Sequence, residues 1–489
     1  MKIFIPITVH KPHALPWAVL GAVLAALCLS GCALGLPPTQ VPSQVSTQWH
    51  APLPHEGQLV QMRDWWKAQQ DPLLLDLLDA AQDASPSVAQ AAARLQSARA
   101  NQATAQAALV PRVDASLATS RGQTQPLTPV ATTSSAGLQA SWEIDLVGAN
   151  RVASEAANAQ VQSGQAQWHD ARVAVAAELA NSYFAWRACK RLAQTAQRDA
   201  ASRQETARLT ELLLRAGLAR AGDLALAQAS AADGRSRQSQ QTAQCDVALK
   251  GLVALTAWEE GALRQRLARP VASAPDLPSF AVTALPAQTI SQRPDVFAAE
   301  RDVVVASAAV GSARAQQWPR LTLSGSIGGL RYSALGVDSD LTTWSLGPLA
   351  LNLPIFDAGQ RAANVDLAQA NYTQSVVAYR AKVRNAVREV EEALVNLQST
   401  QARSADAALA LGGYSQALEL GTLRYRQGMA NLLELEDARR LALAAESALA
   451  TLQLDRQRAW VALYRAAGGG WDAQEAQTTV VPPVPLLAP

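Results

Sequence analysis

Four stretches of the chain alternate between apolar and polar residues. The clearest is 138–145, and 321–327 repeats its pattern. A third apolar face in 349–355 consists of Leu349, Leu351, Leu353 and Ile355, and the weakest candidate is 113–120. A period of two predicts β-strands with one apolar face, which a soluble β-sandwich would also contain. Strands of about nine to eleven residues are long enough to cross a bilayer when tilted.

The segments around these strands are rich in Ala, Gln, Leu and Arg and predict helices. Two helices of roughly twenty residues, 87–108 and 295–317, are each followed by a helix-breaking proline. Two strands joined by a polar, Gly/Ser/Thr-rich loop come next in each case. A helix of about 64 residues, roughly 95 Å long, then begins near Arg151 or Arg361. The glycines that end these helices are Gly217 and Gly428, and the helices that follow are 222–255 and 431–467. Helices this long need a coiled-coil partner, which the helix after each glycine supplies.

The same order of elements occurs twice because the sequence is duplicated. The segment that starts at Pro86 recurs 208 residues later at Pro294, and Arg215 recurs 211 residues later as Arg426. A unit of about 200 residues is too long for a solenoid repeat, so we expect a duplicated domain half. The predicted organisation is a first repeat over 63–257, a connector over 258–291 and a second repeat over 292–471.

Both ends of the chain lie outside these repeats. Lys2 and Lys11 precede a short apolar run, which predicts a signal peptide over 1–31. The run ends in Leu-Ser-Gly-Cys, a sequence similar to the bacterial lipobox, so Cys32 is the expected lipidation (palmitate) site. An ordinary signal peptide that happens to contain a cysteine is the alternative. A linker over 32–62 and a Pro-rich tail over 472–489 complete the division.

Composition limits the classes of function. The net charge of +2 gives no argument for nucleic-acid binding. Past the signal, no apolar run is long enough for a spanning helix, so a membrane crossing would require β-strands. Four strands cannot close a barrel, and lipid does not tolerate an open strand edge. Several chains would therefore have to combine, and three chains would supply twelve strands.

Two cysteines of the expected mature chain lie symmetrically about one glycine. Cys189 precedes Gly217 by 28 residues, and Cys245 follows it by 28. Antiparallel helices that fold back at Gly217 would bring both thiols to the same level. A disulfide needs Cα atoms within roughly 7 Å, closer than usual helix spacing, and the Ala-rich surroundings allow such an approach. The alternatives are a structural disulfide, which the spacing favours, and two buried free thiols.

Several motifs in their order along the chain resemble one protein family. They are Trp65-Trp66 with Asp71-Pro72-Leu73, the segment 141–148 (SWEIDLVG), Arg293-Pro294-Asp295-Val296, the segment 353–359 (LPIFDAG) and Gly468-Gly469-Gly470-Trp471. These motifs are similar to those of TolC-like outer-membrane efflux proteins, specifically the NodT/OprM-type lipoproteins. Val147 stands where Trp or Phe is more usual in the family.

The resemblance implies a fold that is mostly α-helical with membrane β-strands. Each chain of a homotrimer would contribute two long coiled-coil hairpins and four strands to a twelve-helix α-barrel and a twelve-strand β-barrel. The implied location is the outer membrane, with lipid contacts and a projection into the periplasm. The implied partners are a periplasmic adaptor (membrane fusion) protein and an inner-membrane pump of the resistance-nodulation-division class.

The resemblance also suggests residues that close the pore at the helix tips, near Gly217 and Gly428. The matching positions are Tyr425, Glu434 and Asp437 in the second repeat and Asp223 in the first. Threefold symmetry would turn each acid into a ring of three carboxylates, which favours cations. The alternative is that 434–440 is a charged, solvated helix face, as we expect for Glu436, Arg439 and Arg440.

No constellation of residues indicates bond chemistry. The chain has no P-loop, no dinucleotide fingerprint and no catalytic triad, and its histidines lack metal-ligand spacing. We therefore expect no enzyme, cofactor or metal. The predicted function is the passive exit duct of a tripartite efflux or secretion system. The alternative is a periplasmic coiled-coil structural or adaptor lipoprotein, which would not need four membrane-length strands.

Overall fold

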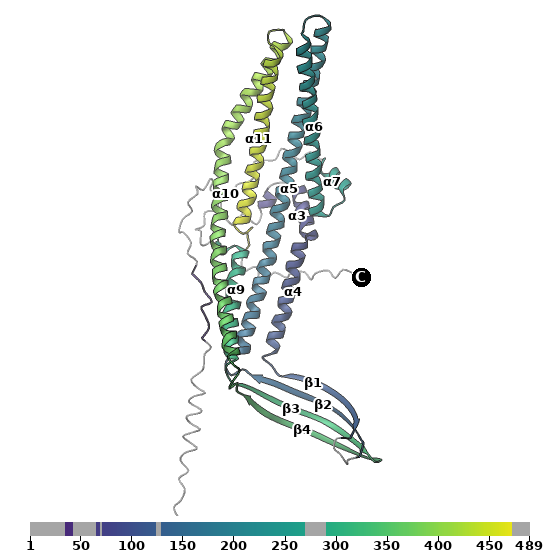
Figure 1. Ribbon diagram of the computed structural model, residues 1–489, viewed down its shortest axis with the longest axis vertical. Helices are drawn as coiled ribbons and strands as arrows, with labels where there is room; N and C mark the ends of the chain where they lie inside the picture. The colour runs from purple at the N-terminus through teal and green to yellow at the C-terminus, as the bar shows by residue number, and fades with distance from the viewer. Residues whose placement is uncertain (1–34, 43–64, 69–70, 124–128, 269–289, 472–489) are drawn as a thin grey trace, which may run out of the picture. The chain divides into compact units, whose positions relative to one another are not determined.

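A computed structural model of the chain describes residues 35–42, 65–68, 71–123, 129–268 and 290–471 (Figure 1). The predicted signal peptide, Cys32, part of the connector and the Pro-rich tail lie outside the described residues. The chain divides into two compact units that cut across the sequence repeats. The sheet unit takes its residues from 1–39, 101–157 and 305–372, and the helix unit takes its residues from 40–100, 158–304 and 373–489.

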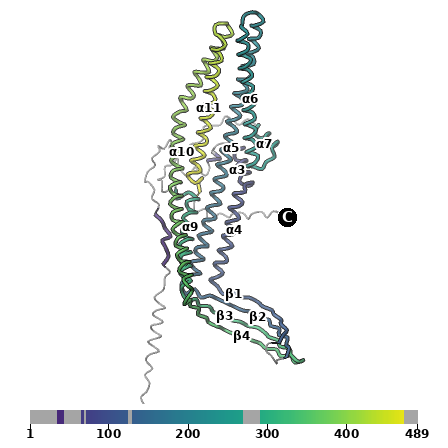
Figure 2. The backbone as a smooth tube through the Cα atoms, in the orientation of Figure 1, coloured from purple at the N-terminus to yellow at the C-terminus, as the bar shows by residue number. Residues whose placement is uncertain are grey.

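The sheet unit contains one antiparallel sheet with the strand order β1-β2-β3-β4. The strands are β1 (Arg112–Gly122), β2 (Ala131–Ile144), β3 (Arg320–Ala334) and β4 (Val337–Asn352). They lie side by side in Figures 1 and 2. The central pair joins the two repeats, because Trp142 of β2 lies opposite Leu323 of β3. Within one chain, β1 and β4 are edge strands, so the sheet is open on both sides.

β1 has 11 residues, within the expected nine to eleven, whereas β2, β3 and β4 are longer, with 14, 15 and 16 residues. In the second repeat the predicted polar loop is wrong, since only Leu335 and Gly336 connect β3 to β4. Both residues have positive φ angles, 53° and 80°, as two-residue hairpin turns require. Cross-strand polar contacts explain why these polar segments pair: Arg331 donates to Asp340 at 2.7 Å and Ser333 to Asp338 at 2.6 Å.

The predicted strand over 349–355 is wrong at its end. β4 stops at Asn352, so Leu353 and Ile355 lie beyond it. Pro354 has no N–H to offer a neighbouring strand, which accounts for the early end. The apolar side chains within the sheet are exposed in the single chain, for example Leu117 at 82% and Trp344 at 77%. The sheet therefore has an uncovered apolar surface as well as open edges.

Two pairs of long helices dominate the rest of the chain. They are α5 (Ala149–Arg215) with α6 (Ala221–Thr256), and α10 (Gln360–Arg426) with α11 (Leu432–Ala466). α5 and α10 each have 67 residues, which confirms the predicted long helices and corresponds to roughly 100 Å. The shorter predicted helices are α4 (Pro86–Ala107) and α9 (Pro294–Ala315). Among the described residues, no helix has both the length and the apolar character that a membrane crossing would need.

The main hydrophobic core of the helix unit surrounds the short helices α2 (Trp65–Ala68), α3 (Pro72–Ala84) and α7 (Glu260–Leu267). Trp65 stacks on Tyr464 of α11 with ring centroids 5.3 Å apart. Asp71 caps α3 and also accepts a hydrogen bond from Tyr183 of α5 at 2.6 Å. The opening motif of the sequence is therefore a packing element that holds α3 against α5.

Two further motifs meet in one place. Arg293 pairs with Asp295 at 2.9 Å, contacts Glu389 of α10 at 2.8 Å and donates to the carbonyl of Ala466 at 3.0 Å. Gly468 follows α11 with φ of 89°, and a Cβ there would lie 2.4 Å from the carbonyl oxygen of Gln292. Only glycine satisfies both restrictions, so the Arg-Pro-Asp motif and the glycine run depend on each other.

Candidate functional site: the hairpin tips and the seam between the hairpins

The two hairpin turns have the same backbone geometry. Gly217 and Gly428 have φ angles of 74° and 75°. The amide of Leu218 donates to the carbonyl of Leu213, and that of Met429 to the carbonyl of Arg424, both at 2.8 Å. Nothing lies within 4 Å of a Cβ placed on either glycine, so the left-handed backbone and not space selects glycine. Both turns lie at the same end of the helix unit (Figure 1).

Two of the four gate candidates occupy equivalent positions just after these turns. Asp223 accepts a hydrogen bond from the amide of Arg220 at 3.2 Å. Glu434, 211 residues later, accepts from the side chain of Asn431 at 2.8 Å. Both carboxylates are the third residue of a capping arrangement, where the helix dipole favours negative charge. Each tip therefore presents one exposed acid whose position the turn determines.

The other two candidates have different surroundings. Asp437 pairs with Arg440 at 2.9 Å, and both side chains are exposed. The hydroxyl of Tyr425 lies 3.0 Å from that of Thr210, which links α10 to α5. Sequence reasoning did not identify Thr210.

The expectation that Glu436 and Arg439 are solvated is wrong. Arg439 is 5% exposed, and the Glu436 side chain is 13% exposed, whereas Arg440 points into solvent as expected. Glu436 and Arg439 belong to a buried charge cluster. We define this cluster as Asp199 and Arg203 of α5 with Glu436 and Arg439 of α11.

Every charge in this cluster has an oppositely charged partner. Arg203 contacts Asp199 at 2.9 Å and Glu436 at 2.6 Å, and Arg439 contacts Glu436 at 2.7 Å. Ser230 of α6 donates to Glu436 at 2.7 Å, so three helices meet here. Burial lowers the pKa of Arg439, and the neighbouring Glu436 carboxylate opposes that effect. Since removing one partner of a buried pair is costly, the cluster holds α5 and α11 together.

A glycine makes room for the cluster. A Cβ on Gly234 of α6 would lie 3.0 Å from Cδ of Arg203 and 3.2 Å from Cα of Ala200. A side chain at position 234 would therefore crowd Arg203 and the α5 backbone, and glycine avoids this contact.

The buried cluster is one step of a polar ladder between α5 and α11, which we call the seam. Arg439 donates to Thr206 at 2.7 Å, Thr195 donates to Glu446 at 2.6 Å, and Arg191 donates to Gln453 at 2.6 Å. The α11 residues of the ladder are 439, 446 and 453, spaced by seven as in a coiled coil. This heptad of polar residues was the signal in the sequence that could have revealed the seam.

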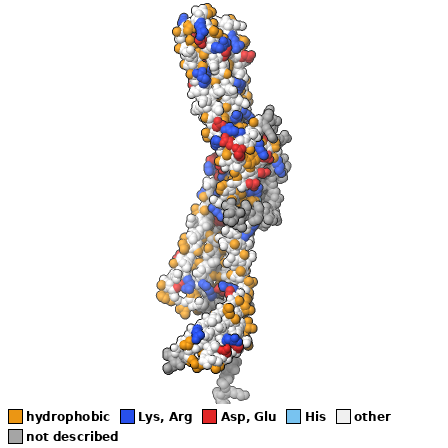
Figure 3. All heavy atoms as spheres, turned by 90° about the vertical axis from the view of Figure 1, so that its right-hand side faces the viewer, with side chains coloured by type: hydrophobic (Ala, Val, Ile, Leu, Met, Phe, Trp, Pro, Cys, Tyr) orange, Lys and Arg blue, Asp and Glu red, His pale blue; other side chains and the backbone are white. Residues whose placement is uncertain are grey.

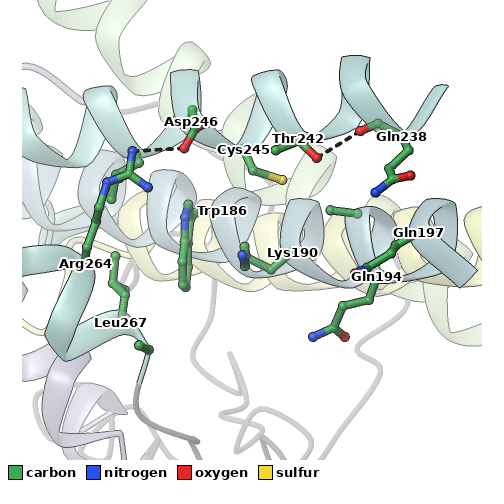
Figure 4. A pocket seen from close by; sticks show the side chains of 13 residues that line it. Trp186, Lys190, Gln194, Gln197, Gln238, Thr242, Cys245, Asp246, Arg264 and Leu267 are labelled. Atoms are coloured by element: carbon green, nitrogen blue, oxygen red, sulfur yellow. Dashed lines mark hydrogen bonds and ion pairs between the residues drawn. The ribbon is translucent and has the colours of Figure 1, made fainter. Parts of the chain in front are cut away.

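The structure joins Cys189 and Cys245 in a disulfide between α5 and α6, with Cα atoms 5.5 Å apart. A groove of about 360 Å³ beside it is lined by α5, α6 and α7 (Figure 4). Arg264 of α7 pairs with Asp246 of α6 at 3.0 Å at one end of this groove. Figure 3 shows positive and negative side chains close together on this side of the unit. In the described part of the chain, no group of His, Cys, Asp and Glu is placed to hold a metal ion.

Comparison with known proteins identifies the class. The sequence model of the family described as outer membrane efflux protein matches residues 77–257 and 285–469. The chain is 33% identical over 428 residues to outer membrane protein OprJ of Pseudomonas aeruginosa, covering 85% of this chain and 88% of OprJ. It is 31% identical over 443 residues to the pyoverdine export outer membrane protein OpmQ of Pseudomonas putida, covering 87% and 92%. It is 29% identical over 419 residues to nodulation protein T of Rhizobium leguminosarum bv. trifolii, covering 83% and 88%.

Solved structures show the same fold. A membrane protein from Pseudomonas aeruginosa matches with a TM-score of 0.77 at 29% identity, covering 89% of this chain and all of that chain. The outer-membrane channel OprN matches with a TM-score of 0.75 at 27% identity, covering 90% and 100%. The expected TolC-like fold, mostly helical with a duplicated helix-and-strand unit, is confirmed.

The chain belongs to the outer membrane efflux protein family, as the sequence motifs predicted. It is an outer-membrane efflux channel, the exit duct of a tripartite system. Members of this family are channels, and this function does not require bond chemistry.

Proposed function

We propose that the channel is a homotrimer that opens and closes at its helix tips, at the seam between α5 and α11. The observation that carries the gating proposal is that the seam is polar. From Glu436 to Gln453 of α11, the two helices are joined by hydrogen bonds and ion pairs, such as Arg203 with Glu436 and Thr195 with Glu446. Separating polar helices exposes little apolar surface, and water replaces the lost hydrogen bonds. A seam of this kind is stable when closed and opens without a large hydrophobic cost.

The uncovered sheet supports the trimer. A four-stranded sheet with two open edges and exposed apolar side chains, such as Leu349 and Leu351, is not stable in lipid by itself. Joining three sheets edge to edge gives twelve strands and removes every edge. The helices of three chains would surround the path in the same threefold arrangement. A coiled-coil adaptor, the alternative function, would have no use for such a sheet.

The channel would act with a periplasmic adaptor and an inner-membrane pump of the resistance-nodulation-division class. As the outer-membrane part of a tripartite system, it supplies neither the energy nor the choice of cargo. A lipid on Cys32 would add a second attachment to the outer membrane. The exposed tips, with Glu434 and Asp437 near the second turn, are the surface that the adaptor would reach.

The acids at the tips would form the narrowest part of the closed channel. Asp437 and Glu434 side chains are each about half exposed, and a trimer would contain three copies of each. Rings of carboxylates attract cations and hold a constriction closed through bound counter-ions. Their removal is therefore expected to increase ion flow.

The experiment is single-channel recording of the purified protein in planar bilayers. The double variant Asp437→Ala with Glu434→Ala is expected to conduct several-fold more than the parent and to lose block by divalent cations. Asp406→Ala is the matched control, because it removes an exposed carboxylate from α10 far from the tip. Unchanged conductance and unchanged cation block in the double variant would contradict the gate.

A further inference from the structure

The first described residues of the chain are bound to the sheet unit. Residues 35–38, which we call the strap, lie against α9 and α10 (Figure 2). Ser307 donates to the carbonyl of Pro37 at 2.7 Å, and Tyr372 donates to the carbonyl of Pro38 at 2.8 Å. Leu36 covers Gly311, where an added Cβ would lie 2.3 Å from its Cδ2 atom. We call Ser307, Gly311 and Tyr372 the notch.

The chemistry of the strap matches that of the notch. Pro37 and Pro38 have no N–H, so their carbonyls are their only backbone hydrogen-bonding groups, and both are used. Consecutive prolines also keep the segment extended before it binds, which lowers the entropy lost on docking. Ser307 is fully buried, and its hydroxyl is directed at the strap. A buried donor of this kind would cost free energy if the strap were absent.

The notch exists in only one of the two repeats. The positions of α4 that correspond to Ser307 and Gly311, 208 residues earlier, are Arg99 and Ala103. Arginine cannot replace the small buried hydroxyl, and alanine would occupy the space that Leu36 needs. Each chain has one notch and one N-terminus, as expected if the notch serves to bind the N-terminus. If Ser307 and Gly311 were needed only for the fold, the first repeat would be expected to contain a similar pair.

We propose that the notch is a docking site for the lipid-bearing N-terminus and determines where the lipid enters the membrane. The proposal rests on the proposed lipidation of Cys32. Cys32 precedes Leu36 by four residues, so the two Cα atoms are at most about 14 Å apart. Gly311 is four residues, about 6 Å, before the end of α9, and β3 begins at Arg320. The lipid is therefore held beside the helix end of the sheet.

Without the strap the lipid would be on a much longer tether. The first core helix, α2, begins at Trp65, 33 residues after Cys32. Thirty-three residues can span at most about 115 Å, against about 14 Å for the four residues between Cys32 and Leu36. Docking in the notch thus changes the lipid from a loose tether into an anchor at a fixed position on the sheet unit.

Disulfide trapping in outer membranes tests the docking. The pair Leu36→Cys with Gly311→Cys is expected to cross-link in most chains under mild oxidation. The matched control is Leu36→Cys with Ala309→Cys, because Ala309 is exposed on the same helix only two residues away. The cross-linked fraction of the notch pair is expected to be several-fold higher than that of the control pair.

A second measurement perturbs the notch. A spin label on Thr39→Cys is expected to be immobilised in the parent and mobile in Gly311→Val, since the valine would displace Leu36. Ala103→Val introduces the same side chain at the corresponding position of α4 and is expected to leave the label immobilised. Equal mobility of the spin label in the two valine variants would contradict docking of the strap in the notch.

Mass spectrometry of the N-terminal peptide separates the two proposals. A cross-linked strap on a chain with acylated Cys32 supports the fixed anchor. Acylated Cys32 with no more cross-linking at Gly311→Cys than at Ala309→Cys overturns the docking while lipidation stands. A cross-linked strap on a chain without acylation overturns the lipid role, and channel recordings then show whether the channel proposal survives.

Discussion

The two hairpins of the helix unit are equivalent elements of the two repeats but are held in different ways. The α5–α6 hairpin is cross-linked by Cys189–Cys245 and contains the Asp199–Arg203 pair. The corresponding positions of α10–α11, 211 residues later, are Thr400, Arg456, Ala410 and Tyr414. The second hairpin instead supplies Glu436 and Arg439, which dock on the first. The difference indicates that duplication produced one hairpin that is cross-linked internally and a second hairpin that docks on the first. If opening separates the seam as we propose, the second hairpin is the one that moves.

Loss of the disulfide should have the largest effect on the difference in stability between the two hairpins. The bridge closes a loop with a sequence separation of 56 residues. In the chain-entropy description, its removal costs about 4 kcal/mol of unfolding free energy. We expect Cys189→Ala with Cys245→Ala to lose protection from hydrogen exchange in α5 and α6, with α10 and α11 less affected. Uniform loss in all four helices would mean that the first hairpin is not separately braced.

Breaking the buried charge cluster should have the next largest effect. Arg203→Ala removes the nearest cation from the buried Asp199 and one of the two cations that pair with Glu436, and we expect a loss of about 3 kcal/mol of unfolding free energy. Denaturant unfolding of the purified protein measures it, and channel recordings should show more frequent opening. Arg440→Ala removes an exposed arginine of α11, next to Arg439 of the cluster, and should change stability by less than about 0.5 kcal/mol. Equal effects of the two variants would contradict a role for burial in the seam.

The free energy of unfolding should fall in acid because of a residue in the first repeat, and this effect should be smaller than that of breaking the charge cluster. Burial, and secondarily the charge of Arg172, lowers the pKa of His169 from 6.5 to about 4. The unfolded chain therefore binds the extra proton first, so stability is full above pH 6.5 and falls as the pH drops towards 4. Allowing for partial solvent access, the loss is about 2 kcal/mol.

His169→Gln should flatten this part of the stability curve in denaturant titrations between pH 7 and pH 4. Arg380 occupies the corresponding position 211 residues later and is always charged, so Arg380→Gln should leave the pH dependence unchanged. A curve for His169→Gln as steep as that of the parent would assign the acid sensitivity to other groups.

The sequence predicted the helices and the tip turns well because their signals are local. Gly217 and Gly428 mark the turns through backbone conformation, and the duplication confirmed each boundary twice. The length of the strands and the short β3–β4 turn could not be predicted, because polar strand residues such as Asp338 and Asp340 depend on partners across the sheet. The burial of Glu436 and Arg439 depends on α5, more than 200 residues away in the chain, and the heptad spacing of positions 439, 446 and 453 is the one sequence signal for it that we identify.

The gate candidates show the same limit. The structure gives Asp223 and Glu434 equivalent capping roles and pairs Asp437 with Arg440, but their proposed ring needs three chains. The contacts of each acid within its own hairpin are determined by a single chain. The distances between equivalent acids across the pore depend on how three chains assemble. Conductance of the Asp437→Ala, Glu434→Ala variant measures the effect of these acids in the assembled channel.

The most direct test of the moving hairpin is a reversible bridge across the seam. Thr195→Cys and Glu446→Cys replace two side chains in hydrogen-bond contact between α5 and α11, and a short reducible thiol linker would join them. Single-channel recording is made before and after reductant, with the unbridged parent as the control for reduction of the native disulfide. We predict that the bridged channel stays at low conductance and that reductant restores opening, while the parent changes little. A bridged channel that opens as widely as the parent would contradict the claim that opening separates the second hairpin from the first.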